Sequence, residues 1–111
     1  MADLTPLVSA LSLRKLCGKD TVTYHGVYAG DLLSRAMIHV KSGSLWITIM
    51  NNMNVIAVAS LTEAAAVLLA EGVSLPIEVQ KAAEEEGITV WQSDADVYHI
   101  CQAIAKENPT L

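Results

Sequence analysis

The sequence predicts a single α/β domain in which a mixed, mostly parallel sheet carries helices on both faces. Three observations lead to this prediction. Short apolar segments alternate along the chain with longer segments of helical periodicity. A chain of 111 residues has room for one hydrophobic core, so residues 1–111 are expected to form one domain. Residues 55–59 are apolar without interruption, which is typical of a strand that helices cover on both sides.

The first 28 residues predict a short helix followed by brief strands. Residues 5–13 carry leucine and valine at helical spacing, which favours the helix. Residues 14–17 then indicate a strand that stops at a glycine-containing turn. Residues 21–24 and 27–28 are rich in β-branched and aromatic side chains, and Gly26 is expected to break them into two pieces.

The middle of the chain predicts one helix and two strands. A helix is expected over residues 30–40, where the apolar residues follow the i, i+3, i+4, i+7 rule. Residues 45–49 alternate as a strand, residues 51–54 predict a turn, and residues 55–59 predict the covered strand. So short a turn favours an antiparallel neighbour, although four residues can also form a helical turn.

The second half predicts three helices and one more strand. Residues 60–72 begin with the capping box Ser-Leu-Thr-Glu, which predicts a helix that ends at a glycine. Another helix is expected over residues 76–87, between a proline and a glycine. A strand follows over residues 88–91, and the last helix is expected to begin at Ser93. Strands joined through helices usually run parallel, with right-handed crossovers.

Composition excludes several classes of protein. The formal net charge is −5 and the seven basic residues are scattered, so nucleic-acid binding, which needs a basic face, is not expected. No apolar run is long enough to span a membrane, and residues 1–13 lack the pattern of a secretory signal. We therefore expect a cytoplasmic protein with reduced thiols at Cys17 and Cys101. Its high apolar content suggests that some apolar surface is left for another subunit.

The sequence contains none of the common catalytic motifs. A phosphate-binding loop, a dinucleotide fingerprint, a nucleophile elbow and a paired-histidine zinc motif are all missing. No enzyme activity, metal or cofactor is predicted. His25, His39 and His99 are scattered and are interpreted as structural or surface residues. An enzyme that uses Asp31, His25 or His99 is the least favoured of three hypotheses.

A ligand site is most expected where strands end at helix N-termini, because free amides and the helix dipole attract anions there. Asparagines in an adjoining loop add hydrogen-bond donors and acceptors. The alternative interpretation is that these residues are only helix caps and turn formers. The predicted ligand-binding residues are Gly30, Asp31, Asn51, Asn52, Ser60, Thr62 and Ser93.

Four segments resemble the DRTGG domain family. Residues 26–34, Gly-Val-Tyr-Ala-Gly-Asp-Leu-Leu-Ser, resemble its opening motif, and residues 45–49 and 54–60 resemble its central strands. Residues 87–90, with the Ser-Asp helix start beyond them, resemble its last strand and helix. The family is similar to the amino-terminal domain of HPr kinase/phosphorylase, and it occurs beside CBS domains and within bacterial phosphotransacetylases. Stand-alone members are often labelled serine-kinase-like, and some are encoded near hydrogenase subunits.

This resemblance implies a bacterial, non-catalytic, dimeric regulatory domain with an α/β fold. The kinase label would mislead here, because the phosphate-binding loop is missing. Two departures concern ligand binding: Asn51 and Asn52 stand where many members carry Asp-Arg, and Ala70-Glu71-Gly72 replaces Thr-Gly-Gly. Without that arginine a phosphate-binding role is in doubt, since a guanidinium is the natural bidentate partner of phosphate.

Two functions remain open at this point. The leading one is a homodimeric sensor that binds a small ligand, such as a nucleotide or a phosphorylated metabolite, near Asp31, Asn51 and Ser60. The alternative is a structural adaptor subunit of a redox (hydrogenase-like) or regulatory complex, without a small ligand. Nothing in the sequence separates them.

Overall fold

Short strands in two sheets form the centre of the computed structural model, which describes residues 1–111. The strands are β1 (Ala2–Asp3), β2 (Arg14–Cys17), β3 (Thr23–Tyr24), β4 (Gly26–Ala29), β5 (Ser44–Thr48), β6 (Ala66–Leu69) and β7 (Val90–Gln92). The main sheet has the order β2-β7-β6-β5-β4, in which β4 to β7 are parallel and β2 is antiparallel to β7. β1 and β3 form a separate antiparallel pair. The predicted fold class is therefore confirmed.

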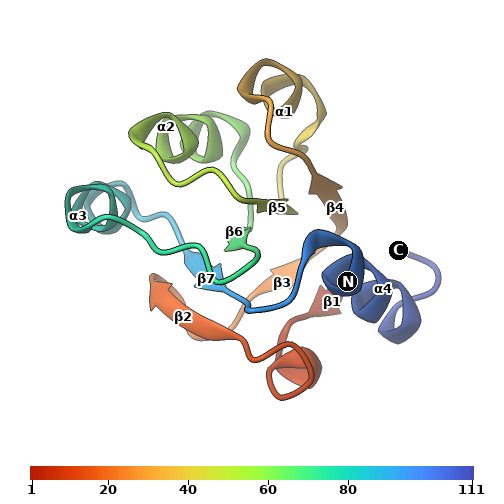
Figure 1. The fold of residues 1–111 in the computed structure, drawn as a ribbon. Helices are drawn as coiled ribbons and strands as arrows, with labels where there is room; N and C mark the ends of the chain where they lie inside the picture. Colours follow the sequence, from red (N-terminus) through yellow and green to blue (C-terminus); the bar gives the residue numbers. More distant parts are fainter.

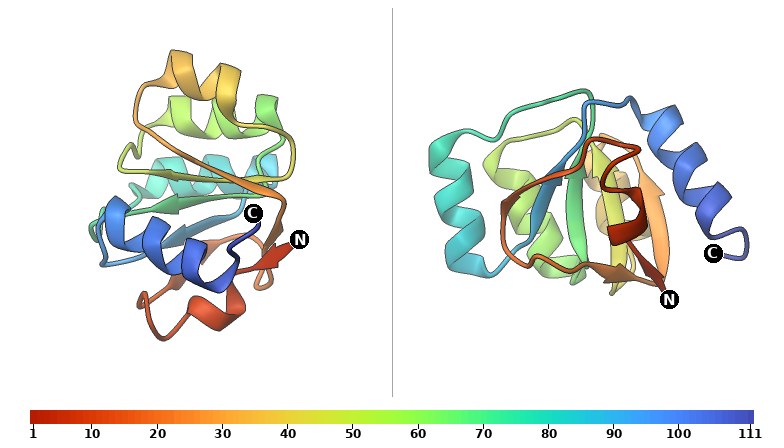
Figure 2. Two further views of the ribbon diagram at one scale, coloured as in Figure 1. Left: turned by 90° about the vertical axis from the view of Figure 1, so that its right-hand side faces the viewer. Right: turned by 90° about the horizontal axis from the view of Figure 1, so that it is seen from below.

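Helices cover both faces of the main sheet. They are the 3-10 helix η1 (Thr5–Leu7) and the α-helices α1 (Leu33–His39), α2 (Met53–Thr62), α3 (Ile77–Glu86) and α4 (Val97–Glu107). The parallel strands follow one another across the sheet in chain order, so right-handed crossovers place α1, α2 and α3 on one face. α4 lies on the other face (Figures 1 and 2). The longest helix has 11 residues, and none has the length and apolar character that a membrane crossing needs.

Alternate residues of the central strands divide the core between the two faces. On β6, Leu68 packs into the cluster beneath α4, and Leu69 packs into the cluster beneath α1, α2 and α3. Both side chains are fully buried. All residues of β5, β6 and β7 are buried, as expected for strands with helices on both sides.

The prediction of a strand over residues 55–59 is wrong, because this segment is part of α2. The side chain of Asn52 caps the helix, with Oδ1 accepting a hydrogen bond from the amide of Val55 at 3.3 Å. Apolar residues lie on the outer side of α2 as well as on its inner side. The helical period is therefore invisible in the sequence, and the segment has the pattern of a covered strand.

The capping box predicted at residues 60–63 is also wrong. α2 ends there, and Glu63 follows as its C-cap in the left-handed region with φ 56°. The chain then forms β6, so the helix predicted over residues 60–72 does not exist. β6 is parallel to β5, which also contradicts the expected antiparallel neighbour. Burial between two helical layers outweighs the helix propensity of the alanines and leucines in this segment.

The other predicted elements are present with shifted ends, except the helix expected over residues 5–13. α3 follows Pro76 and ends at Gly87, whose φ of 69° suits glycine. α4 is present, but its N-cap is Asp96 and not Ser93. The helix predicted over residues 30–40 is shorter at both ends, and residues 5–13 contain only one 3-10 turn. Gly26 begins β4 and does not interrupt the strands, which break at His25.

Candidate functional site

The carboxyl ends of β4, β5, β6 and β7 meet at one edge of the sheet. We call the loops that follow these strands the carboxyl edge. Ligands of open α/β sheets usually bind at such an edge. The strand order does not reverse between β4 and β7, so the carboxyl edge lacks the switch point that usually opens a crevice.

Gly30 and Asp31 form the loop after β4 and are bonded to β5. Asp31 Oδ1 accepts hydrogen bonds from Thr48 Oγ1 at 2.8 Å and from the amide of Ile49 at 3.0 Å. The carbonyl of Gly30 accepts a bond from Trp46 Nε1 at 3.0 Å. A Cβ at Gly30 would come within 2.8 Å of Tyr28 Oη, so the Tyr28 ring would have to shift to make room for any other residue. Asp31 is exposed, and its second carboxylate oxygen has no partner in the chain.

Asn51 and Asn52 lie in the loop after β5, two and three residues beyond Ile49, whose amide binds Asp31. Asn51 Nδ2 donates a 2.7 Å hydrogen bond to the carbonyl of Ser74, which joins this loop to the loop after β6. Asn52 uses Oδ1 to cap α2. The amide oxygen of Asn51 and the amide nitrogen of Asn52 therefore remain available. Together with Asp31 they present two acceptors and one donor at the ends of β4 and β5.

The other predicted binding residues do not join this group. Ser60 and Thr62 lie in the last turn of α2, at the opposite edge of the sheet, and Thr62 Oγ1 donates to the carbonyl of Val58 at 2.8 Å. Ser93 is fully buried and bonds to the carbonyl of Leu11 at 2.6 Å. The expectation that Ser60 and Thr62 begin a helix at a strand end is therefore wrong, because the helix predicted over residues 60–72 does not form. Ser93 does lie between β7 and α4, as predicted, but its hydroxyl is buried and accepts a hydrogen bond from the amide of Ala95.

A cation that the sequence analysis missed lies on the far flank of the carboxyl edge. Arg14, on β2, donates two hydrogen bonds to Asp94, at 2.8 and 3.1 Å, and one to Gln92 Oε1 at 2.9 Å. Its guanidinium lowers the pKa of the Asp94 carboxyl, chiefly through the hydrogen bond. Four strand spacings, about 19 Å, separate β2 from β4, so one small group cannot contact both Arg14 and Asp31. Only the pairing of β2 with β7 reveals this cation.

The histidines and thiols occupy separate places in the fold. His25 packs on Gly43, His39 stacks on Tyr28 with 5.8 Å between ring centroids, and His99 Nδ1 lies 2.7 Å from Asp96 Oδ1. No group of three or more acidic, histidine or cysteine side chains is arranged to hold a metal ion. The two cysteines are free and belong to the clusters on opposite faces of the sheet. Burial raises the pKa of both thiols.

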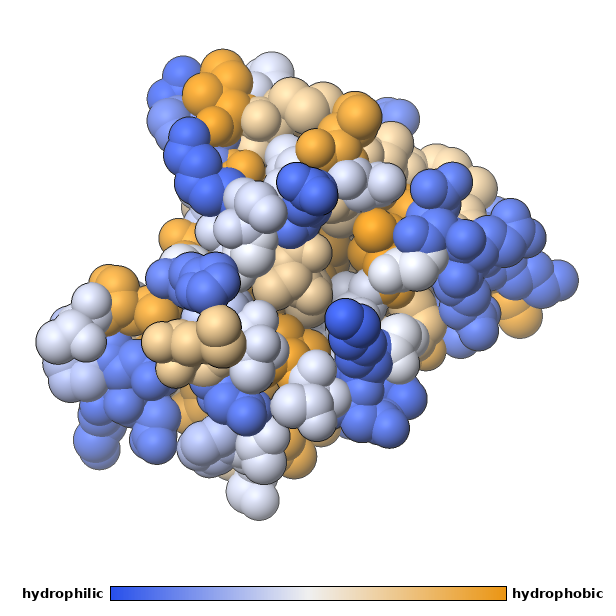
Figure 3. Space-filling model, turned by 180° about the vertical axis from the view of Figure 1, so that it is seen from behind, coloured by the Kyte–Doolittle hydropathy of each residue, from blue (hydrophilic) through white to orange (hydrophobic).

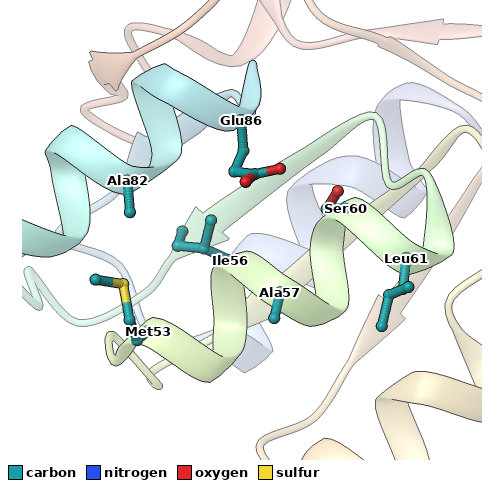
Figure 4. A pocket seen from close by; sticks show the side chains of 7 residues that line it. All are labelled: Met53, Ile56, Ala57, Ser60, Leu61, Ala82 and Glu86. Atoms are coloured by element: carbon teal, nitrogen blue, oxygen red, sulfur yellow. The ribbon is translucent and has the colours of Figure 1, made fainter.

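Three hollows mark the surface, and none is at the carboxyl edge. The first, of about 370 Å³, lies between α2 and α3 and includes Ser60 (Figure 4). The second, of about 290 Å³, lies between β4 and the end of α4, and the third, of about 470 Å³, lies between η1 and α4. Asp31, Asn51 and Asn52 therefore form an open polar surface and do not line a closed pocket.

A parallel sheet extended by one antiparallel strand, with polar loops at its carboxyl edge, defines a small α/β domain. The chain belongs to the DRTGG domain family, whose model matches residues 6–106, and this confirms the family resemblance. No curated protein matches the sequence.

The fold is similar to a crystal structure of the CBS and DRTGG domains of the regulatory region of Clostridium perfringens pyrophosphatase. That structure is complexed with its activator, diadenosine tetraphosphate. The TM-score is 0.74 at 14% sequence identity. The similarity covers 91% of this chain and 45% of the other, so this chain spans less than half of that structure.

Proposed function

We propose that this chain is a non-catalytic regulatory domain that binds a small polar ligand and acts as a homodimer. The observation that carries the proposal is the open group of Asp31, Asn51 and Asn52 in a member of the DRTGG family. The pyrophosphatase region that shares this fold has a regulatory role and an activator that is a nucleotide. A nucleotide is therefore the first class of ligand to test.

The chemistry of the carboxyl edge suits the polar parts of a nucleotide. A carboxylate such as Asp31 accepts hydrogen bonds from ribose hydroxyls, and two amides match the donors and acceptors of a base. Phosphate finds less support, because Arg14 lies across the sheet and already binds Asp94. A phosphate that binds Arg14 must displace this carboxylate. We expect the nucleoside part to dominate recognition, and phosphorylated metabolites without a base to bind more weakly.

A thermal-shift screen tests the proposal. The panel contains adenine and guanine nucleotides, a dinucleoside polyphosphate, their nucleosides and common sugar phosphates. A ligand present at about a hundred times its dissociation constant stabilises the fold by roughly 2.7 kcal/mol. For a chain of this size such a gain raises Tm by several degrees. A screen without any shift would count against ligand binding.

Variants at the carboxyl edge then locate the site. Asp31→Asn and Asn51→Ala should each remove most of the ligand-induced shift. Asp20→Asn should retain it, because Asp20 is an exposed carboxylate that binds Lys15 at the opposite edge of the sheet. The ligand-induced shift of Arg14→Lys tests only whether a phosphate of the ligand contacts Arg14. A ligand that stabilises Asp31→Asn and Asn51→Ala as much as the wild type binds elsewhere, and the proposed site would be abandoned.

The second candidate function is an adaptor subunit of a redox (hydrogenase-like) or regulatory complex. The uncharged outer side of α2 favours it, because an apolar helical surface of this kind suits a protein contact. Isolation of the native complex from the source cell, with the chain in fixed stoichiometry to a redox subunit, would support this function. A clear nucleotide response together with a chain that purifies without a partner would exclude it.

A further inference from the structure

Helix α2 carries apolar residues on its outer side. None of its ten residues is charged. Val55, Ile56, Val58 and Ala59 face the sheet and are buried, whereas Met53, Ala57 and Leu61 are exposed at i, i+4 and i+8. Leu61 is 71% exposed and Met53 is 50% exposed. A helix that is apolar on all sides is normally buried on all sides.

The apolar surface continues onto α1 and into the hollow beside α3. α1 packs beside α2, and it exposes Met37 and Ile38. We call Met37, Ile38, Met53, Ala57 and Leu61 the helical face. Viewed from behind, apolar residues gather over α1 and α2, and hydrophilic residues gather over α3 (Figure 3). The hollow between α2 and α3 has an apolar floor, with Ser60 and Glu86 at one end (Figure 4).

The two flanks of the helical face carry opposite charge. On the α1 side, Arg35 and Lys41 are exposed, and residues 32–43 contain no acidic side chain. On the other side, α3 contains four glutamates and one lysine, a net charge of −3. The exposed charges of α3 are Glu78, Lys81, Glu84, Glu85 and Glu86. A positive flank, an uncharged centre and a negative flank therefore lie side by side.

We propose that the helical face binds the same face of a second copy of the chain, with the two-fold axis running along α2. The inference rests on the homodimer of the proposed function and identifies its interface. All three helices return from the end of one parallel strand to the start of the next, so they point in the same direction. An axis parallel to α2 places α2 against α2 and the positive α1 flank of each copy against the negative α3 flank of the other.

The positions along the helices agree with this arrangement. A parallel axis keeps corresponding helix ends at the same level. Arg35, in the first half of α1, then lies opposite Glu78 in the first turn of α3 of the second copy. Lys41, just beyond α1, lies at the level of Glu86. The alternative axis, perpendicular to α2, would place α3 against α3 and bring like charges together, which is unfavourable.

Sedimentation equilibrium over a range of concentrations tests the interface. Leu61→Glu should raise the dimer dissociation constant at least about tenfold, because it would bury an unpaired carboxylate. Tyr98→Glu is the matched control: Tyr98 is 67% exposed, compared with 71% for Leu61, but lies on α4 at the other face. It should leave the constant unchanged. Circular dichroism checks that both variants fold.

Cysteine cross-linking tests the direction of the axis. In a Cys101→Ser background, Leu61→Cys should form a disulfide with its own copy under mild oxidation, because a parallel axis brings Leu61 near Leu61. With the perpendicular axis Leu61 would face Met53 instead. Preferential cross-linking between Leu61→Cys and Met53→Cys in a mixture of the two variants would overturn the proposed axis.

Two further outcomes would overturn the inference. One is a wild-type chain that stays monomeric up to about 0.5 mM, which would leave the helical face to a different protein. The other is a dimer that Leu61→Glu leaves intact, which would move the interface to another surface. Ligand binding is tested separately, since the nucleotide screen can be run on the Leu61→Glu monomer. Failure of the interface and failure of the ligand site are therefore distinguishable.

Discussion

The two faces of the sheet are covered by helices of different character. Their inner sides are alike, because 15 buried residues form the cluster beneath α4 and 13 form the cluster beneath α1, α2 and α3. Their outer sides differ. α4 buries Ile100 and Ile104 and exposes polar residues such as His99 and Lys106. α2 is apolar on both sides. The comparison shows that the outer side of a helix, more than its buried side, indicates whether water or another protein covers it.

The two layers also differ in their polar connections. On the α4 side of the sheet, two hydrogen bonds reach the N-terminal segment: the buried Ser93 Oγ donates to the carbonyl of Leu11, and the half-buried Trp91 Nε1 bond goes to the carbonyl of Lys19. In the layer of α1, α2 and α3, Gln80 Nε2 of α3 donates to the carbonyl of Leu16 on β2, and Trp46 Nε1 donates to the carbonyl of Gly30. The following predictions test whether this contrast has energetic consequences.

The largest effect is expected in the two cores. Leu68→Ala and Leu69→Ala change adjacent residues of β6 that point into opposite layers, and both are fully buried. Each should lower the free energy of unfolding by about 3 kcal/mol, through lost burial and a residual cavity. Urea denaturation at low protein concentration measures both. A large loss for one variant and almost none for the other would show that the layers do not unfold as one unit.

The next effect concerns the buried hydroxyl of Ser93. Ser93→Ala removes the donor to the carbonyl of Leu11 and the acceptor for the amide of Ala95. The buried carbonyl of Leu11 and the half-buried amide of Ala95 then lose their partner, and the free energy of unfolding should fall by about 2 kcal/mol. Ser34→Ala, on the exposed surface of α1, is the control and should change stability by less than about 0.5 kcal/mol. If Ser93→Ala and Ser34→Ala both change the free energy of unfolding by the same small amount, the bond to Leu11 contributes little.

The caps of α2 and α4 should differ in their response to pH. Asn52→Ala removes an uncharged cap of α2 and should cost about 1 kcal/mol at every pH. At α4, the amide of His99 donates to Asp96 and lowers the pKa of that carboxyl. The stability that Asp96 contributes is therefore present above the ordinary carboxyl pKa of 3.8 and is lost as pH falls through the lowered pKa.

Thermal unfolding of both cap variants across acidic pH makes this comparison. The difference between Asp96→Ala and the wild type should shrink at low pH, and the difference for Asn52→Ala should stay constant. If the stability difference between Asp96→Ala and the wild type does not change with pH, the charge of Asp96 does not contribute to the cap.

The smallest expected effect is a gain, not a loss, in the free energy of unfolding. Tyr24 lies in the α4-side cluster, and its buried hydroxyl has no hydrogen-bond partner. Tyr24→Phe should therefore raise the free energy of unfolding by about 1 kcal/mol, because it removes an unsatisfied polar group. Urea denaturation at neutral pH measures the change. A loss of stability would show that the hydroxyl has a bound partner in solution.

The same variant changes the alkaline limit of the fold. Burial, with smaller contributions from Asp3 and Glu107, raises the pKa of Tyr24 to about 12. The raised pKa favours the neutral phenol in the folded state. Wild-type stability should therefore be complete below the unfolded-state pKa of about 10 and decrease as pH rises toward about 12. Tyr24→Phe should lack this decrease.

The sequence predicted well those elements whose ends carry their own signals. α3 is an example, because Pro76 suits a helix start and Gly87 adopts the left-handed conformation that ends it. Asn51 and Asn52 were also placed correctly in a loop, since short polar side chains favour turns in most settings. Asp31 was expected at the start of the helix over residues 30–40, but it lies in the loop that precedes α1. Their position at one edge of the sheet follows from parallel strand pairing.

The predictions failed where an element has no polar side. α2 has no charged residue and no polar side, and β6 is apolar throughout, so the sequence could not show which of them is the helix and which is the strand. Ser60 and Thr62 were misplaced with them. A serine can begin a helix or lie in its last turn, and the sequence did not show whether the helix follows or precedes Ser60. Arg14 was missed because its contacts with Gln92 and Asp94 join residues that are 78 and 80 positions apart.

The sequence alone thus determined the fold class, the family and the polar loop at residues 51–52. The tertiary structure decided which apolar segment became the central strand β6, since only packing between two helical layers distinguishes β6 from α2. It also decided that α1, α2 and α3 share one face, with basic residues at one flank and acidic residues at the other. Local patterns report a residue's own neighbours in the chain, whereas these features depend on which distant segments pair.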